Sequence, residues 1–100
     1  MPAVITWRPA ALDAREALLV HGAAEFGSAV ALETDQQLVE AVAQLATHPQ
    51  LGRRGRVAGT RELVAPRTPF LVISRYTAAP APGGIEVVEI LHHARRWPGD

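Results

Sequence analysis

Arginine is the residue type with the most capacity for chemistry in this sequence, and it concentrates in the second half. A guanidinium donates a planar fork of N–H groups to a carboxylate or a phosphate, and a nearby histidine can transfer a proton near neutral pH. The pattern therefore predicts an anionic site or an anion-binding surface. Its candidate residues are Arg53, Arg54, Arg56, Arg61, Arg75, His92, Arg95 and Arg96.

The charge balance of the two halves supports an anion-binding surface in the second half. Residues 1–50 contain two arginines and six acidic residues, whereas residues 51–100 contain eight arginines and four acidic residues. The halves therefore carry formal charges of −4 and +4, although the whole chain is neutral. A positive region raises the local concentration of anionic partners. All ten basic residues are arginine, which also fits a GC-rich genome and does not by itself indicate binding.

Several kinds of site are not expected. The chain has no cysteine, which removes disulfides, thiolate nucleophiles and zinc fingers. Neither Ser28 nor Ser74 lies in the G-x-S-x-G motif of a serine hydrolase. His92 and His93 would point to opposite faces of a strand, so they would not share a metal ion. We therefore expect no metal site and no cofactor.

Length and composition favour a single soluble domain. Hydrophobic residues make up 48% and charged residues 20% of the chain, a balance typical of a packed core. The N-terminus, Met1-Pro2-Ala3, has no positive charge before an apolar run, so no signal peptide is expected. No apolar stretch approaches the ~18 residues of a membrane helix. We expect one domain, residues 1–100, that is cytoplasmic and has no membrane contact.

The first half predicts one strand and two helices. Residues 3–7 are β-prone, and the proline at position 9 suits the first turn of a helix that runs to about residue 25. Gly27 should break this helix, and Ser28 is then expected to cap a second helix at residues 28–47. The first helix places Leu12, Leu19 and Ala23 on one side, and the second has a buried stripe at Leu38, Val42 and Leu45.

The second half predicts strands. A polar loop at residues 51–58 precedes strand-like runs at 60–64, 70–73 and 85–91, and residues 77–84 read as a loop. Short turns between such runs favour an antiparallel meander, which the first strand would complete. The expected fold class is α+β with the order β-α-α-β-β-β, in which an N-terminal helical hairpin packs on a small antiparallel sheet.

Two interpretations of the arginines follow from this sheet. In the first, Arg61, Arg75 and Arg95 meet at one edge and form a concave anionic site, with His92 as proton donor or acceptor. In the second, the arginines form a solvated fringe and pair with nearby carboxylates. Those carboxylates would be Glu62, Glu86 and Glu89. Spacing alone favours the second interpretation.

Five segments occur in an order that carries a resemblance to a known family. They are Ile5-Thr6-Trp7-Arg8-Pro9-Ala10-Ala11, His48-Pro49-Gln50-Leu51-Gly52-Arg53, Gly59-Thr60-Arg61-Glu62-Leu63-Val64, Thr68-Pro69-Phe70-Leu71-Val72 and Ile90-Leu91-His92-His93-Ala94-Arg95-Arg96-Trp97. Together they resemble the successive landmarks of the RelE/ParE toxin superfamily. The stretch from His48 to Pro98 is similar to the sheet half of such a toxin. No segment is specific alone, but the ordered set covers most of the chain.

The resemblance implies the toxin of a type II toxin–antitoxin system. It implies the β-α-α-β-β-β fold and growth arrest. It also implies a cognate antitoxin that winds an extended or helical segment around the toxin in a hetero-oligomer. Docking is expected on the helical hairpin and the sheet edge. ParE-like members of the superfamily inhibit DNA gyrase, whereas RelE-like members cut messenger RNA on the ribosome.

Departures from the RNA-cutting branch favour a ParE-like toxin that is not an enzyme. Pro69 stands where that branch has an arginine, the chain has no lysine, and no tyrosine follows the last strand. Only Arg53, Arg54 or Arg56 could replace the missing lysines. Arg95 nevertheless aligns with a catalytic arginine of that branch, and His92 with a histidine. Two alternatives remain. One is an inactive relic that still binds its antitoxin, and the other is a ribosome-dependent endoribonuclease that uses Arg61, Arg75, His92 and Arg95.

Overall fold

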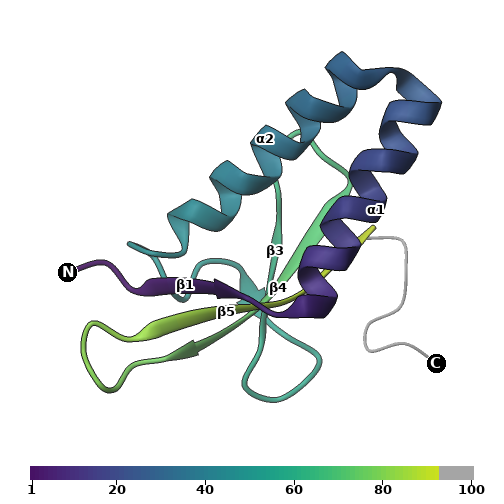
Figure 1. Ribbon diagram of the computed structural model, residues 1–100. Coiled ribbons are helices and arrows are strands. Elements are labelled where there is room, and N and C mark those ends of the chain that lie inside the picture. Colours follow the sequence, from purple (N-terminus) through teal and green to yellow (C-terminus); the bar gives the residue numbers. More distant parts are fainter. Residues whose placement is uncertain (93–100) are drawn as a thin grey trace.

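The computed structural model describes residues 1–92, in which two helices pack on one face of a five-stranded sheet (Figure 1). In chain order the elements are β1 (Val4–Trp7), α1 (Pro9–Phe26), α2 (Ser28–Gln44), β2 (Arg53–Arg54), β3 (Arg61–Val64), β4 (Phe70–Thr77) and β5 (Gly84–His92). Apart from the two-residue strand β2, this order confirms the predicted β-α-α-β-β-β arrangement and the α+β class.

The strand order across the sheet is β1-β5-β4-β3-β2. β3, β4 and β5 form the predicted antiparallel meander, with Val72 opposite Ile90. β1 lies beside β5 in the same direction, with Trp7 opposite Val87. The sheet is therefore mixed, and the expectation of a purely antiparallel sheet is corrected at this one pair.

A glycine reverses the chain between the two helices. Gly27 has a φ of 93°, in the left-handed region that residues with a Cβ rarely adopt. Its N–H donates to the carbonyl of Ala23 at 3.0 Å, which closes the end of α1. The sequence predicts Ser28 as the cap of α2, and this prediction is wrong. Ser28 is the first residue of the helix, Gly27 occupies the cap position, and no side chain caps that end.

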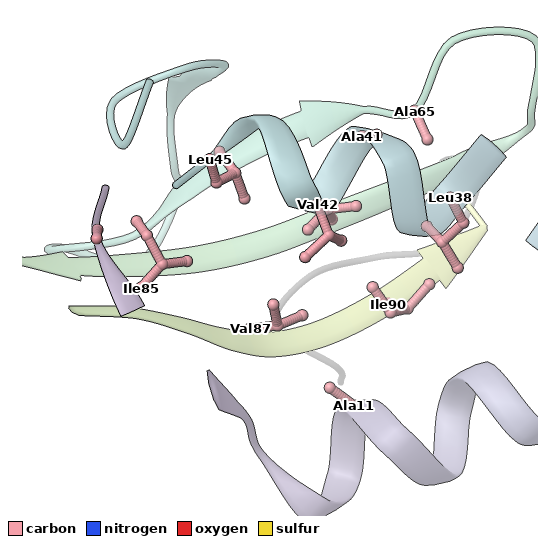
Figure 2. Packing of buried hydrophobic residues seen from close by; sticks show 11 residues of the cluster. Ala11, Leu38, Ala41, Val42, Leu45, Ala65, Ile85, Val87 and Ile90 are labelled. Carbon is pink, nitrogen blue, oxygen red and sulfur yellow. The ribbon is translucent and has the colours of Figure 1, made fainter. Parts of the chain in front are cut away.

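The predicted stripe of α2 is confirmed as the main contribution of the helices to the core. Leu38, Val42 and Leu45 are buried and face the sheet, where they pack over the strand that carries Ile85 and Val87 (Figure 2). Burying each side chain of this size contributes about 1.5–3 kcal/mol. The three residues therefore fix α2 over the middle of the sheet.

α1 contacts the sheet through a small side chain. Ala11 is fully buried, whereas Leu12 is 47% exposed. The side of α1 that carries Leu12 is therefore not the side that faces the core. Apolar residues occur on nearly every side of this helix, so spacing alone does not define which side faces the core. Because α1 lies close to β5, only a small side chain such as that of Ala11 fits between them.

The sheet has a second apolar cluster on its outer face, which is the face away from the helices. Leu71, Ile73 and Val88 are buried there. β4 continues to Thr77, four residues beyond the predicted apolar run. Because side chains alternate along a strand, Arg75 lies on the same outer face as Leu71 and Ile73. The longer strand therefore brings a guanidinium onto a surface that the helices do not cover.

Candidate target-binding surface

Four of the predicted arginines lie on the hairpin of β2 and β3. The pairing places Arg54 directly opposite Arg61, and Arg53 opposite Glu62. Arg56 follows in the connecting turn. The sequence predicts only a polar loop at residues 51–58, whereas the structure has the short strand β2 within this range. It matters because residues opposite each other across an antiparallel pair project to the same face.

The turn of this hairpin is held by its own backbone. The N–H of Gly55 donates to the carbonyl of Thr60 at 2.7 Å, and the N–H of Thr60 donates to the carbonyl of Val57 at 3.1 Å. A side chain at position 55 would overlap the hydroxyl of Thr60, so the turn requires glycine there. The arginines are therefore carried on a closed and ordered turn.

A buried carboxylate organises two of these arginines. The side chain of Glu62 is 0% exposed, and its Oε1 accepts from Nη2 of Arg53 at 2.9 Å and from Nε at 3.3 Å. Its Oε2 accepts from the backbone N–H of Arg56 at 3.0 Å, and Nη2 of Arg56 lies 3.5 Å from Oε1. The two guanidinium side chains themselves remain 65% and 45% exposed. Glu62 therefore fixes both arginines and leaves each in contact with solvent.

These contacts decide the ionisation of Glu62. Burial of the carboxyl is the largest single influence and acts to raise its pKa. The backbone N–H of Arg56, the guanidinium of Arg53 and the charges of both arginines act in the opposite sense and together outweigh burial. The pKa of Glu62 therefore lies below its ordinary value of 4.5. Glu62 is an anion in the folded protein at neutral pH.

A second carboxylate holds arginines on the outer face of the sheet. Oε1 of Glu86 lies 2.8 Å from Nη2 of Arg8 and 3.8 Å from Nη1 of Arg75. The interpretation as a fringe of paired arginines is therefore confirmed at Glu62 and Glu86. Glu89 differs, because its carboxylate accepts from the backbone N–H of Ile90 at 3.1 Å.

His92 does not lie beside these arginines. It is the last residue of β5 and pairs with Phe70, and the two rings meet edge to face with centroids 6.4 Å apart. Arg61 instead lies opposite Ser74, four residues further along β4. At ~3.4 Å per residue the two positions are roughly 14 Å apart along the sheet. The structure therefore separates His92 from Arg61 and Arg75, and Arg95 and Arg96 lie outside the described residues.

A groove lies between the helical hairpin and the end of the sheet where β4 begins and β5 ends. Its volume is about 510 Å³. Its apolar lining consists of Leu18, Leu19, Phe26, Val30, Leu38, Pro69 and Phe70, with His92 beside them. Phe26 and Val30 are 68% and 49% exposed. The sequence predicts docking on the helical hairpin, but it does not predict this groove. Apolar residues on either side of the Gly27 break are the signal that points to it.

An ion pair closes one side of the groove and joins the two helices. Nε and Nη2 of Arg15 donate to the two carboxylate oxygens of Asp35 at 2.8 and 2.9 Å. The hydrogen bond to Asp35 raises the pKa of Arg15 above its ordinary value. The guanidinium also lies over the ring of Trp7, 5.3 Å from its centroid. The groove therefore has a fixed wall on this side.

Metal binding and membrane insertion gain no support from residues 1–92. Within that range no three His, Asp or Glu side chains gather as they would around a metal ion. No helix of the same range combines the length and apolar character needed to cross a membrane.

The fold and the sequence comparisons place this small α+β domain in the RelE/ParE superfamily. The sequence model of the family described as "ParE toxin of type II toxin-antitoxin system, parDE" matches residues 5–97. This match spans nearly the whole chain, so the chain belongs to the ParE toxin family.

Two relatives agree with this assignment. A chain of the "Chromosomal ParDE TA system from P. aeruginosa" is 26% identical with a TM-score of 0.79, and the match covers 90% of this chain and 95% of that one. The protein named "Putative toxin Y4kP" from Sinorhizobium fredii (strain NBRC 101917 / NGR234) is 34% identical over 58 residues. That match covers 58% of this chain and 55% of Y4kP.

Proposed function

We propose that this member of the ParE toxin family arrests growth by inhibiting DNA gyrase and that it catalyses no reaction. The separation of His92 from Arg61 and Arg75 is the observation that argues against catalysis, and membership of the ParE toxin family supports gyrase as the target. An endoribonuclease needs its proton donor and its phosphate ligands to converge on one phosphate. β4 also begins directly after Pro69, which offers neither charge nor proton. A shaped surface suffices to trap an enzyme.

A supercoiling assay with purified gyrase and purified toxin tests the target. We expect the toxin to inhibit supercoiling, and premixing it with its antitoxin to remove the inhibition. Growth arrest on induction together with normal gyrase activity would refute the proposal. The assay thus separates an active toxin with another target from a gyrase inhibitor.

The endoribonuclease alternative has its own measurement. Primer extension on translated messages after induction should show no new cleavage in the ribosomal A site. Cleavage there would favour the RelE-like alternative, with Arg61, Arg75, His92 and Arg95 as its residues. An induction that leaves growth unchanged would instead favour an inactive relic.

We place the cognate antitoxin on the helical hairpin, with an apolar segment of it in the groove. The groove exposes Phe26 and Val30 to water, which is costly unless a partner covers them. The P. aeruginosa structure to which the chain is similar belongs to a ParDE toxin–antitoxin system, which supports a partner of this kind. An amphipathic helix that fills a hydrophobic groove is a common mode of recognition.

Two aspartate variants on α2 test this placement. Val30→Asp puts a charge into the groove and should weaken antitoxin binding at least tenfold by calorimetry. Leu32→Asp is the matched control, because Leu32 is 59% exposed on the same helix and does not line the groove. Equal binding by the two variants would contradict the placement. Co-expression with the antitoxin should also raise soluble yield and melting temperature, since a ligand of the folded state stabilises it.

A further inference from the structure

Charge is divided between the two layers of the domain. The helices α1 and α2 carry six acidic residues and a single arginine, Arg15. Residues 45–92 carry six arginines and three glutamates. The described part of the molecule therefore has a negative helical layer and a positive sheet side. A charge separation of this kind orients the molecule in the field of a large anion, so that the sheet side approaches first.

Within the positive side, Arg54 and Arg61 are an unusual pair. They lie directly opposite each other across β2 and β3, and like charges in this position destabilise a sheet. Nη1 of Arg61 donates to the carbonyl of Gly52 at 3.3 Å. Within residues 1–92 neither guanidinium has an ion pair with a carboxylate. An external anion would remove this repulsion.

The hairpin also positions two of its arginines before any ligand binds. The buried carboxylate of Glu62 binds Arg53 and Arg56, and the hydrogen-bonded turn at Gly55 sets the spacing of β2 and β3. A guanidinium has five N–H donors. Nη1 of Arg53 is not engaged by Glu62, so this side chain retains donors that can reach a neighbouring phosphate. Arg53 and Arg56 are thus held by the buried carboxylate, while Arg54 and Arg61 project together to the opposite face of the same hairpin.

We propose that the β2–β3 hairpin is a phosphate-binding site for the backbone of duplex DNA, with Arg54 and Arg61 as its principal ligands. The planar fork of arginine matches the geometry of a phosphate, and two opposed arginines can share adjacent phosphates of one strand. The choice of DNA as the source of phosphate rests on the proposed function, because gyrase acts on DNA. On this basis the toxin contacts the DNA that its target enzyme holds.

Fluorescence anisotropy with a fluorescein-labelled 20-base-pair duplex tests the site without gyrase. The purified toxin should bind the duplex at low salt, with affinity falling steeply as salt rises, because phosphate contacts release counterions. The double variant Arg54→Gln/Arg61→Gln should bind about tenfold more weakly, with a salt slope smaller by about two. Arg54→Lys/Arg61→Lys keeps the charge and should recover most of the loss.

Arg67→Gln is the matched control, because Arg67 is an exposed arginine on the turn between β3 and β4, away from the hairpin. It should bind the duplex within twofold of the unchanged protein. Melting temperatures of all variants should agree within a few degrees, which shows that they fold. No DNA binding by the unchanged protein, or equal loss in Arg67→Gln and the double variant, would overturn the inference. Tighter binding to single-stranded RNA or to an acidic peptide than to duplex DNA would also overturn it.

These outcomes are independent of the gyrase assay. If the toxin binds DNA through Arg54 and Arg61 but leaves supercoiling unchanged, the site stands and the proposed target fails. If the toxin inhibits gyrase but does not bind the duplex, or if the double variant binds the duplex as well as the unchanged protein, the target stands and the site fails.

Discussion

The hairpin of β2 and β3 and the groove beside α1 and α2 are built on opposite principles. The hairpin is polar, its turn is closed by backbone hydrogen bonds, and two of its four arginines, Arg53 and Arg56, are held by Glu62. The groove is apolar, and Phe26 and Val30 stand in it without neighbours that cover them. The first surface is ordered by polar contacts before a partner binds, whereas the second exposes apolar side chains until a partner covers them.

The comparison suggests which surface meets which partner. A preformed cationic site suits a target that is met briefly and by diffusion, because electrostatic attraction raises the rate of encounter. A hydrophobic groove suits a long-lived partner, because burial of apolar surface slows dissociation. Under the proposed function, the first description corresponds to the target and the second to the antitoxin. The following predictions test the contrast, from the largest effect to the smallest.

The largest effect is expected where the groove shares a residue with the core. Leu38 lines the groove and is only 1% exposed. Leu38→Ala removes buried methyl groups and leaves a cavity, so the free energy of unfolding should fall by about 3 kcal/mol. Leu32→Ala on the exposed side of α2 should change it by less than about 0.5 kcal/mol. Urea unfolding measures the free energy of unfolding of both variants. A decrease of similar size in the two would contradict the placement of Leu38 in the core.

A smaller effect is expected at the carboxylate of the hairpin. Glu62→Gln keeps the shape of the side chain but removes its charge and one acceptor, so stability should fall by about 2 kcal/mol. The variant should also lose order in residues 53–60, which amide hydrogen exchange can follow. Glu89→Gln is the control, since the Glu89 carboxylate accepts from the backbone of Ile90 and has no ion pair with an arginine of residues 1–92. Unchanged amide hydrogen exchange in Glu62→Gln would show that the backbone hydrogen bonds of the turn keep it ordered without the carboxylate.

Acid should weaken the hairpin through the same carboxylate. The pKa of Glu62 is lowered on folding, so the folded state favours the ionised form. The resulting stabilisation is fully present above the unfolded pKa of about 4.5 and is lost as the pH falls through the lower folded value. The stability difference between the unchanged protein and Glu62→Gln should therefore be constant from pH 7 to 5 and shrink below pH 4.5. A difference that already disappears at pH 6 would contradict this assignment.

The smallest effect is expected at the wall of the groove. Arg15→Lys keeps the charge but cannot form the two-pronged contact with Asp35, and it contacts the ring of Trp7 less well. Thermal unfolding should show a loss of about 1 kcal/mol. Arg67→Lys should be neutral, because surface arginines without such contacts contribute little. If antitoxin affinity falls in Arg15→Lys while stability does not, the ion pair belongs to the docking surface and not to the fold.

The order of the elements, apart from β2, follows from local sequence, and so does the face of α2 that packs on the sheet, although this helix ends at Gln44 and not at the predicted residue 47. The spacing of Leu38, Val42 and Leu45 defines one face of α2, and this periodicity is a local property that neighbours in the chain fix. The strand runs of β3, β4 and β5 are equally local. The ordered landmarks then identified the family, which the match over residues 5–97 confirms.

Only the tertiary structure decided how the candidate residues are grouped. Which arginine meets which carboxylate depends on strand register, and a shift of one residue would send each side chain to the other face. The register places Arg53 and Arg56 on Glu62, leaves Arg54 facing Arg61, and sets His92 apart from them. The groove likewise depends on the angle at which two helices pack on the sheet. Local sequence patterns do not predict such contacts, because the contacts join residues that are far apart in the chain.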